Sequence, residues 1–305
     1  MNILFFSQSG AARYANEQFA AFANRVLSDG GIIQRPDYVY QMYKLLYELG
    51  YSAGGGAPLQ IRRMYDALAG VKLNNVSGTD YVQTMYDFGN TSDARVNAVQ
   101  TTAANQPLWA THATLPAGIR APQFDGSNDI MTIADLGIYN GQAAGTLTVI
   151  ANDFARTGGD ADHAAIFISR GDLATSTRSA LFTRGGGSAN SFTAAGRRLD
   201  ADSLRNSSNS ASADGLNRLT GLFVWGGNTL QLITNGTAQT ATTFSSGAGP
   251  TQTNDSLAFT LGAVNATTAR LNGIIPHAMA ARIVLTSDQN AKIRELQKSF
   301  YTSLP

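Results

Sequence analysis

Apolar residues recur at helical spacing in the first fifty residues of the chain. One stripe runs from Asn16 to the break at Gly30-Gly31, and its members lie at i, i+3, i+4, i+7 and i+8, on one helix face. A second stripe of the same spacing follows Pro36, a residue suited to the first position of a helix, and Gly50 is its expected C′ residue. The pattern predicts two amphipathic helices with these apolar residues: Phe19, Phe22, Ala23, Val26 and Leu27 in the first, and Val39, Met42, Tyr43, Leu46 and Tyr47 in the second.

A third, shorter helix is predicted from Pro58 to Leu68, because Ile61, Met64 and Tyr65 continue the helical spacing. Seven of the eleven tyrosines of the chain precede residue 70. Two interpretations of these rings stay open at this point. They pack a small helical core, or they form an aromatic docking surface for another subunit, since tyrosine is enriched in protein interfaces.

After residue 74 the helical spacing gives way to short β-branched runs bounded by turn residues. The dipeptide Asn235-Gly236 favours a type I′ hairpin, because both of its positions need a positive φ. No intervening segment is long enough to form the crossover helices of a parallel sheet, so the pattern predicts an antiparallel sandwich. The predicted strands are residues 145–150, 164–169, 219–225, 230–234, 257–261 and 280–285.

The end of the chain again has helical spacing. Thr286 and Gln289 fit the capping-box pattern, and Ile293, Leu296 and Phe300 follow as an apolar stripe. The three glutamates of the chain all fall in predicted helical stretches, and no lysine occurs between residues 72 and 292. Both residue types are depleted in strands, so composition also indicates a β-rich middle with helical ends.

Charge and composition exclude several classes of protein. The 305 residues contain 22 Lys and Arg against 21 Asp and Glu, a net charge of +1, which does not suit a protein whose main partner is nucleic acid. No apolar run approaches the ~20 residues needed to span a bilayer, and the start of the chain lacks the basic region of a secretory signal. The absence of cysteine excludes disulfides, thiolate zinc sites and cysteine nucleophiles.

Three stretches in the first half of the predicted sandwich carry a family resemblance: Met85–Asn90, Asn97–Pro107 and Pro122–Asp129. They resemble the opening of concanavalin A-like, laminin-G-like jelly-roll domains found in bacteriophage virion proteins and some bacterial surface proteins. Two later stretches, Leu232–Gly236 and Leu271–Ile275, resemble the family's Asn-Gly hairpin strand and its Phe-Asn-Gly segment. The similarity covers roughly residues 74 to 303. It departs from the family at residues 88–89, Phe-Gly, where polar side chains are usual.

The resemblance implies a mainly β fold, a jelly-roll sandwich with a C-terminal helix over residues 74–305, preceded by a helical anchoring region over residues 1–73. It also implies a structural virion protein of a bacteriophage, a head or tail decoration, fibre or spike assembled in the host cytoplasm. Other virion proteins and host surface glycans are the expected partners. A homo-oligomer, most simply a trimer, is expected because such proteins occupy symmetric sites, and Tyr40, Tyr43 and Tyr47 are its expected contact residues.

The alternative is a polysaccharide depolymerase or glycosidase on the same fold. Glycosidases work with a pair of carboxylates, but the predicted sandwich has no glutamate before Glu295. Two Asp-x-Asp pairs, Asp160 with Asp162 and Asp200 with Asp202, fall in predicted loops and are interpreted as solvated turn residues. No catalytic residue is therefore assigned, and the protein is expected not to be an enzyme.

Metal and cofactor sites are also not expected. The three histidines, His112, His163 and His277, form no metal-binding motif. Two groups are candidate cation ligands: Asp160 and Asp162 with His163, and Asp125, Ser127 and Asp129 for calcium. Neither has the EF-hand spacing, and the resemblance implies a structural role for the turn at residues 124–129.

A sugar site would stack a tryptophan or tyrosine ring on the sugar and add amide or carboxylate hydrogen bonds. Trp225 ends an apolar strand and is predicted to lie in the core. Trp109 lies beside a threonine-rich stretch and is the better exposed candidate, so it is the predicted stacking residue if such a site exists.

Overall fold

The computed structural model describes residues 9–52, 57–90, 95–134, 137–154, 163–169, 179–184, 191–209, 215–253, 258–263 and 270–305. These residues contain three α-helices, α1 (Gly10–Ser28), α2 (Pro36–Ser52) and α3 (Ser287–Phe300). The strands are β1 (Arg63–Asp66), β2 (Val71–Val76), β3 (Thr79–Met85), β4 (Ala98–Val99), β5 (Leu108–Thr111), β6 (Arg120–Asp125), β7 (Met131–Ile133), β8 (Gly145–Asp153), β9 (His163–Ser169), β10 (Ser179–Arg184), β11 (Ser191–Gly196), β12 (Arg205–Ser208), β13 (Asn217–Val224), β14 (Thr229–Thr234), β15 (Thr237–Ala238), β16 (Phe259–Leu261) and β17 (Asn272–Ala281).

The strands form two antiparallel layers that share β3. In the first layer, β17 pairs with β8, and the sheet continues through β13, β14 and β15. The other edge of β17 pairs with β6 and then with β1, and β6 leads through β5 and β3 to β2. The second layer runs from β3 through β4, β7, β16, β9, β10 and β11 to β12. The predicted mainly β sandwich is confirmed.

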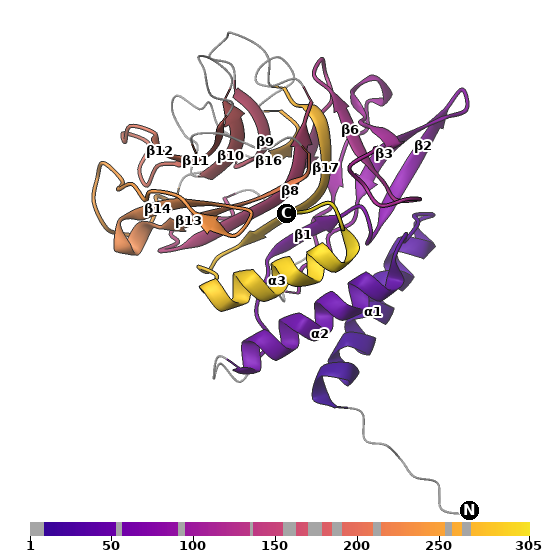
Figure 1. Cartoon of the computed structure of the whole chain (residues 1–305), viewed down its shortest axis with the longest axis horizontal. Coiled ribbons are helices and arrows are strands. Elements are labelled where there is room, and N and C mark those ends of the chain that lie inside the picture. Colours follow the sequence, from indigo (N-terminus) through magenta and orange to yellow (C-terminus); the bar gives the residue numbers. More distant parts are fainter. Residues whose placement is uncertain are drawn as a thin grey trace, which may run out of the picture.

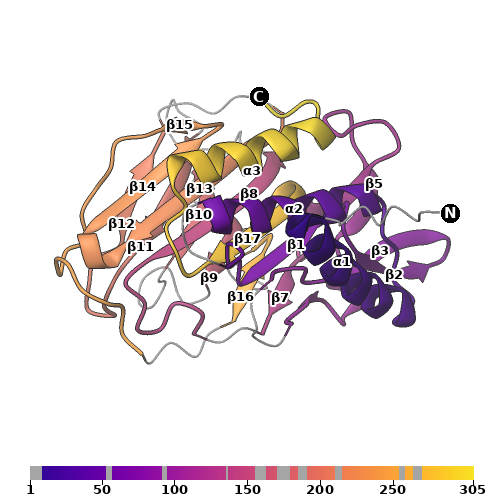
Figure 2. The same ribbon diagram turned by 90° about the horizontal axis from the view of Figure 1, so that it is seen from below.

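All three helices lie on one side of the sandwich (Figures 1 and 2). The predicted starts of α2 at Pro36 and of α3 after its capping box are confirmed, with Thr286 Oγ1 accepting from Gln289 N–H and Gln289 Oε1 from Thr286 N–H. The predicted end of α2 at Gly50 is wrong, because the helix continues to Ser52. A Cβ on Gly50 would overlap the carbonyl oxygen of Ala57, so glycine is needed there for a close approach of two backbones.

The third predicted helix is wrong. Residues 63–66 form β1, which pairs with residues 277–280 of β17 and is buried on both faces. Because both faces are covered, the charged residues Arg63 and Asp66 are buried together with Met64 and Tyr65. A short apolar spacing through such a segment does not distinguish a helix from a buried strand. The tertiary contacts, and not the local pattern, decide its conformation.

The strand predictions hold for most of the middle of the chain. β8, β9 and β14 contain the predicted runs, and β13 contains the run predicted at 219–225 except for Trp225, which begins a short 3₁₀ helix. The Asn235-Gly236 turn has a positive φ at both residues, 51° and 89°. The predicted strand at 280–285 is displaced, because β17 ends at Ala281. Beyond Ala281 the side chain of Thr146 takes the place of backbone strand pairing, because its hydroxyl donates to Ile283 O and accepts from Leu285 N–H.

The predicted boundary at residue 73 falls inside β2, and one continuous hydrophobic core includes residues from both sides of it. The division into residues 1–73 and 74–305 stays a prediction. The expected tyrosine contact face is wrong in part, because Tyr43 is 1% exposed and packs against Phe88 with ring centroids 6.3 Å apart. No helix of the described residues is long and apolar enough to cross a membrane.

A buried carboxylate connects the helices to the sheet. Asp66, at the end of β1, has no exposed surface. Its Oδ2 accepts from Tyr38 of α2 at 2.9 Å and from His277 Nδ1 of β17 at 2.8 Å. Its Oδ1 accepts from Tyr301, which follows α3, at 2.6 Å and from the Leu68 N–H at 2.8 Å. Burial, and then the charge of Asp66, raise the pKa of both phenols well above the usual value, so both remain donors.

Replacing Asp66 by alanine is expected to lower the free energy of unfolding by about 3–5 kcal/mol, because three buried side-chain donors lose their acceptor at once. Urea unfolding followed by circular dichroism measures the loss. Asp66→Asn keeps the shape of the side chain and is expected to lose less. Glu17→Ala breaks an exposed ion pair with Arg13 and should cost about 0.5 kcal/mol or less. An Asp66→Ala protein as stable as the control would contradict the role given to Asp66.

Candidate functional site

A pocket of about 600 Å³ opens between the β2–β3 hairpin, the short helical turn at residues 103–105 and the turn that follows β6. Its lining combines apolar side chains with amides and carboxylates. Ligand pockets in proteins have this volume and this mixture of surfaces. The lining residues are Val76, Tyr81, Ala103, Ala104, Gln106, Leu108, Gln123, Asp125, Asn128 and Asp129.

Strand register brings an aromatic ring, an aliphatic side chain and an amide into one row. Tyr81 of β3 is opposite Leu108 of β5, and Leu108 is opposite Gln123 of β6. Directly opposed residues point to the same face of a sheet, with Cβ atoms about 4.5–5.5 Å apart. Asp125 lies two residues beyond Gln123 and therefore on the same face. The row forms a continuous surface across three strands.

The same alternation turns Trp109 away from the pocket. It follows Leu108 in β5, points to the opposite face and is only 5% exposed. The prediction that Trp109 stacks on a sugar is therefore wrong, because the pleat assigns the outward position to its neighbour. Trp225 has no exposed surface, which confirms its predicted place in the core.

Hydrogen bonds within the protein hold two of the lining amides in place. Gln106 donates to Gln100 O at 2.7 Å and accepts from Asn74 at 2.9 Å. Asn128 donates to Ala104 O at 2.6 Å, which ties the two turns at the rim of the pocket together. These contacts fix the walls of the pocket before any ligand arrives.

Two other lining side chains have no partner among the described residues. Tyr81 is half-buried, and within the described part of the chain its side chain makes no hydrogen bond and no ring contact. The Gln123 amide likewise has no side-chain hydrogen bond to the described residues. A ring face and an amide that the described residues leave without a partner can bind an amphipathic ligand.

The turn after β6 supplies two carboxylates. Asp125 Oδ1 accepts from the N–H groups of Ser127 and Asn128, at 2.7 and 3.2 Å, and Asp129 Oδ2 accepts from Asp125 N–H at 2.9 Å. Gly126 has a φ of +76°, which the turn requires. The two carboxylates of the candidate calcium group, Asp125 and Asp129, thus hold their own turn. Among the described residues, no three histidine, aspartate or glutamate side chains gather to hold a metal ion.

Asp129 has an unusual protonation equilibrium. Burial, and then the negative charge of Asp125, raise the pKa of its carboxyl to about 7, against the weaker opposing effect of the Asp125 N–H donor. The residue is 6% exposed, and none of the described residues donates to its Oδ1. Asp129 therefore lines the pocket with a carboxyl group of which, within the described part of the chain, only Oδ2 accepts a hydrogen bond.

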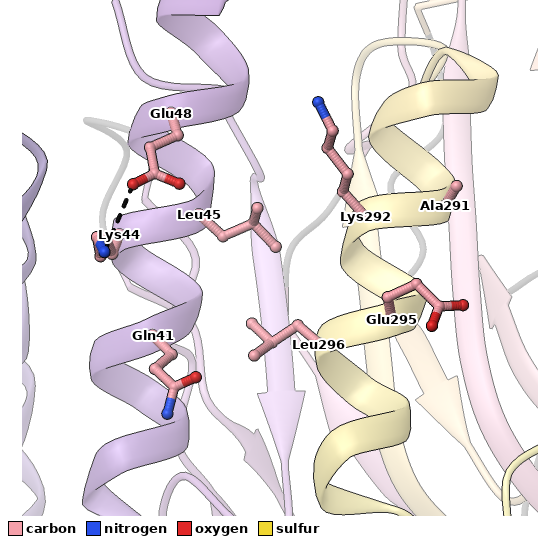
Figure 3. Close-up of a pocket in the computed structure, with 8 residues that line it drawn as sticks. All are labelled: Gln41, Lys44, Leu45, Glu48, Ala291, Lys292, Glu295 and Leu296. Atoms are coloured by element: carbon pink, nitrogen blue, oxygen red, sulfur yellow. Dashed lines mark ion pairs between the residues drawn. The ribbon is translucent and has the colours of Figure 1, made fainter.

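A second cavity, of about 380 Å³, is a groove between α2 and α3 (Figure 3). Leu45 and Leu296 point toward each other across it. Its charged rim is largely satisfied within each helix, since Lys44 pairs with Glu48 at 3.7 Å. Lys292 likewise pairs with Asp288 of its own helix at 2.9 Å. The groove offers fewer unpaired polar groups than the pocket of Tyr81.

The remaining predicted residues lie elsewhere. His112 bonds Thr114 and stacks on Phe154, and His277 belongs to the Asp66 cluster. Asp202 is 9% exposed and accepts from two backbone N–H groups and from Ser246, so the interpretation of it as a solvated residue is wrong. His163 opens β9, while Asp160 and Asp162 lie outside the described residues.

The sequence matches no protein-family model and no curated protein. Among solved structures it is similar to the CBM40 domain of a Ruminococcus gnavus IT-sialidase, solved with α2,3-sialyllactose. The TM-score is 0.45 and the identity 12%, over 57% of this chain and 95% of that domain. It is also similar to the receptor-binding domain of botulinum neurotoxin D, with a TM-score of 0.47 and 11% identity, over 68% of this chain and about half, 51%, of that one. At this level of likeness, the function has to be judged from the pocket's own residues.

The raised pKa of Asp129 predicts a pH-dependent stability. The carboxyl of Asp129 ionises near pH 4 in the unfolded chain and near pH 7 in the folded protein. Between these pH values the folded state therefore binds more protons than the unfolded state. The contribution of Asp129 to the free energy of unfolding should therefore fall as the pH rises from about 4 to about 7, and Asp129→Asn should abolish this dependence. Urea unfolding of both proteins at pH 5 and pH 8 measures it. If the free energies of unfolding of the two proteins differ by the same amount at pH 5 and at pH 8, the pH dependence assigned to Asp129 is contradicted.

Proposed function

We propose that this protein binds a saccharide in the pocket lined by Tyr81, Leu108, Gln123, Asp125 and Asp129. The observation that carries the proposal is the row of Tyr81, Leu108 and Gln123, in which an aromatic ring and an amide share one surface and neither side chain has a partner among the described residues. A pyranose has an apolar C–H face and a rim of hydroxyl groups. The ring suits the apolar face, while the amide and the carboxylates suit the hydroxyls.

Preorganisation supports the same proposal. Gln106 and Asn128 are already held by protein hydrogen bonds, and the turn from Asp125 to Asp129 is closed by its own side chains. A ligand that enters such a pocket orders few side chains, so less of the contact energy is lost to conformational entropy. Weakly hydrophobic, hydroxyl-rich ligands need this, because each individual contact with them contributes little.

Tyr81→Ala is expected to weaken saccharide binding about tenfold or more, since an aromatic residue at the centre of a contact surface typically contributes ~2 kcal/mol. A glycan array identifies a ligand, and isothermal titration calorimetry then compares the variant with the wild-type protein. Tyr51→Ala is the matched control, because Tyr51 is 45% exposed on α2, outside the pocket. Undiminished binding by Tyr81→Ala, or an equal loss in Tyr51→Ala, would place the ligand elsewhere.

One observation favours a second function, a glycosidase or polysaccharide depolymerase. Two carboxylates line the same pocket, and the pKa of Asp129 is raised to about 7, which is the protonation behaviour of a general acid. Incubation with surface polysaccharides and measurement of new reducing ends tests it. Release of ends that is lost in Asp129→Asn supports the enzyme, and its absence with binding intact supports a binding protein.

The family resemblance in the sequence also indicates where the protein acts. We propose that the chain is a structural protein of a bacteriophage particle, assembled in the host cytoplasm as a homo-oligomer with other virion proteins, and that its pocket faces host surface glycans. The support is the order of the stretches at residues 85–90, 97–107 and 122–129. Mass spectrometry of purified virions and light scattering of the purified protein test the location and the oligomeric state.

A further inference from the structure

The charge of the pocket restricts the saccharides that fit it. Among the described residues, its lining contains two carboxylates, Asp125 and Asp129, and no lysine, arginine or histidine. A third carboxylate, Asp80, neighbours Tyr81 in β3 and is partly neutralised by Arg120 at 3.6 Å. The protein as a whole has a net charge of only +1, so no general positive field offsets this local negative one.

Asp129 is the lining residue that we expect to bind a charged group of the ligand. Its Oδ2 is occupied by the Asp125 N–H, while none of the described residues donates to its Oδ1. The side chain is nearly buried, and the charge acting on it is the negative one of Asp125. A carboxylate oxygen beside a second carboxylate gains most from a positively charged donor.

We infer, on the basis of the proposed saccharide binding, that the pocket takes a sugar unit with a free amino group and excludes acidic sugars such as uronic and sialic acids. The ammonium group donates to Asp129 Oδ1 and lies within the field of Asp125. A ligand carboxylate at the same place meets two like charges with no cation in the lining to pair with it, and like charges at short range disfavour binding.

Three tetrasaccharides that differ in charge test the inference: β-1,4-linked glucosamine, its N-acetylated counterpart and a uronic acid tetramer. Calorimetry at near-neutral pH is expected to show at least about tenfold tighter binding of the glucosamine tetramer than of the N-acetylated one, the ratio typical of a charge-assisted hydrogen bond. The uronic acid tetramer is expected to bind at least about tenfold more weakly than the N-acetylated one.

Asp129→Asn separates this preference from the rest of the site. Asparagine keeps an oxygen that accepts from Asp125 N–H, so the turn should persist. The variant is expected to lose most of the preference for the amine, measured as the ratio of its own affinities for the glucosamine tetramer and the N-acetylated tetramer. Asp288→Asn removes one negative charge on α3, outside the pocket, and should leave the preference unchanged.

The carboxyl of Asp129 provides a second measurement. In an NMR titration its pKa should fall below 7 in the complex with the glucosamine tetramer, because an ammonium group stabilises the ionised form. The N-acetylated tetramer carries no charge and should not lower this pKa to the same degree. A pKa unaffected by the amine would place the ammonium group away from Asp129.

The outcomes distinguish this inference from the proposal on which it rests. Equal affinities for the three tetramers, tighter binding of the acidic one, or an amine preference that survives in Asp129→Asn overturns the inference. If array glycans still bind and depend on Tyr81, saccharide binding stands. If no saccharide binds to the wild-type protein at all, both fail.

Discussion

Hydrogen bonds to one buried carboxylate, that of Asp66, join the helical layer to the sandwich. Asp66 lies where β1 ends against β17, and its two oxygens accept from α2, from β17, from the segment after α3 and from the chain's own backbone. A buried charge is costly unless its hydrogen bonds are made, and here four donors satisfy it. Because those donors come from both ends of the chain, the helices and the sheet must be assembled together for Asp66 to be accommodated.

Arg218 has a similar role along α3. Its guanidinium donates to Gln297 and Asn290 of α3 at 2.6 and 2.8 Å and to Thr220 of its own strand. Burial, and then the charge of Arg294, lower its pKa to about 9, which leaves it protonated at neutral pH. Both connections are polar and directional, so they specify one orientation of α3 on the sheet, which apolar contacts alone would do less strictly.

The pocket lies on the part of the sheet formed by β3, β5 and β6, where β6 pairs with β17. The inward residues of these strands, such as Trp109 and Phe124, are buried and keep the strands in register. The outward residues are then placed by the pleat without needing protein contacts of their own. A binding surface requires a rigid support, here the packed inner face of these strands, and side chains that are available to a ligand, here Tyr81 and Gln123, which have no side-chain partner among the described residues.

The sequence by itself determined the elements whose signals are local. The cap at Thr286, the helix start at Pro36 and the turn at Asn235-Gly236 depend on neighbours within four residues, and the alternation in the middle of the chain was enough to indicate a sandwich. Only the tertiary structure decided the conformation of β1, because its pairing partner is more than 200 residues away. It also decided the site, since the row of Tyr81, Leu108 and Gln123 exists only through strand register, and whether Leu108 or Trp109 faces the pocket depends on which face the core covers.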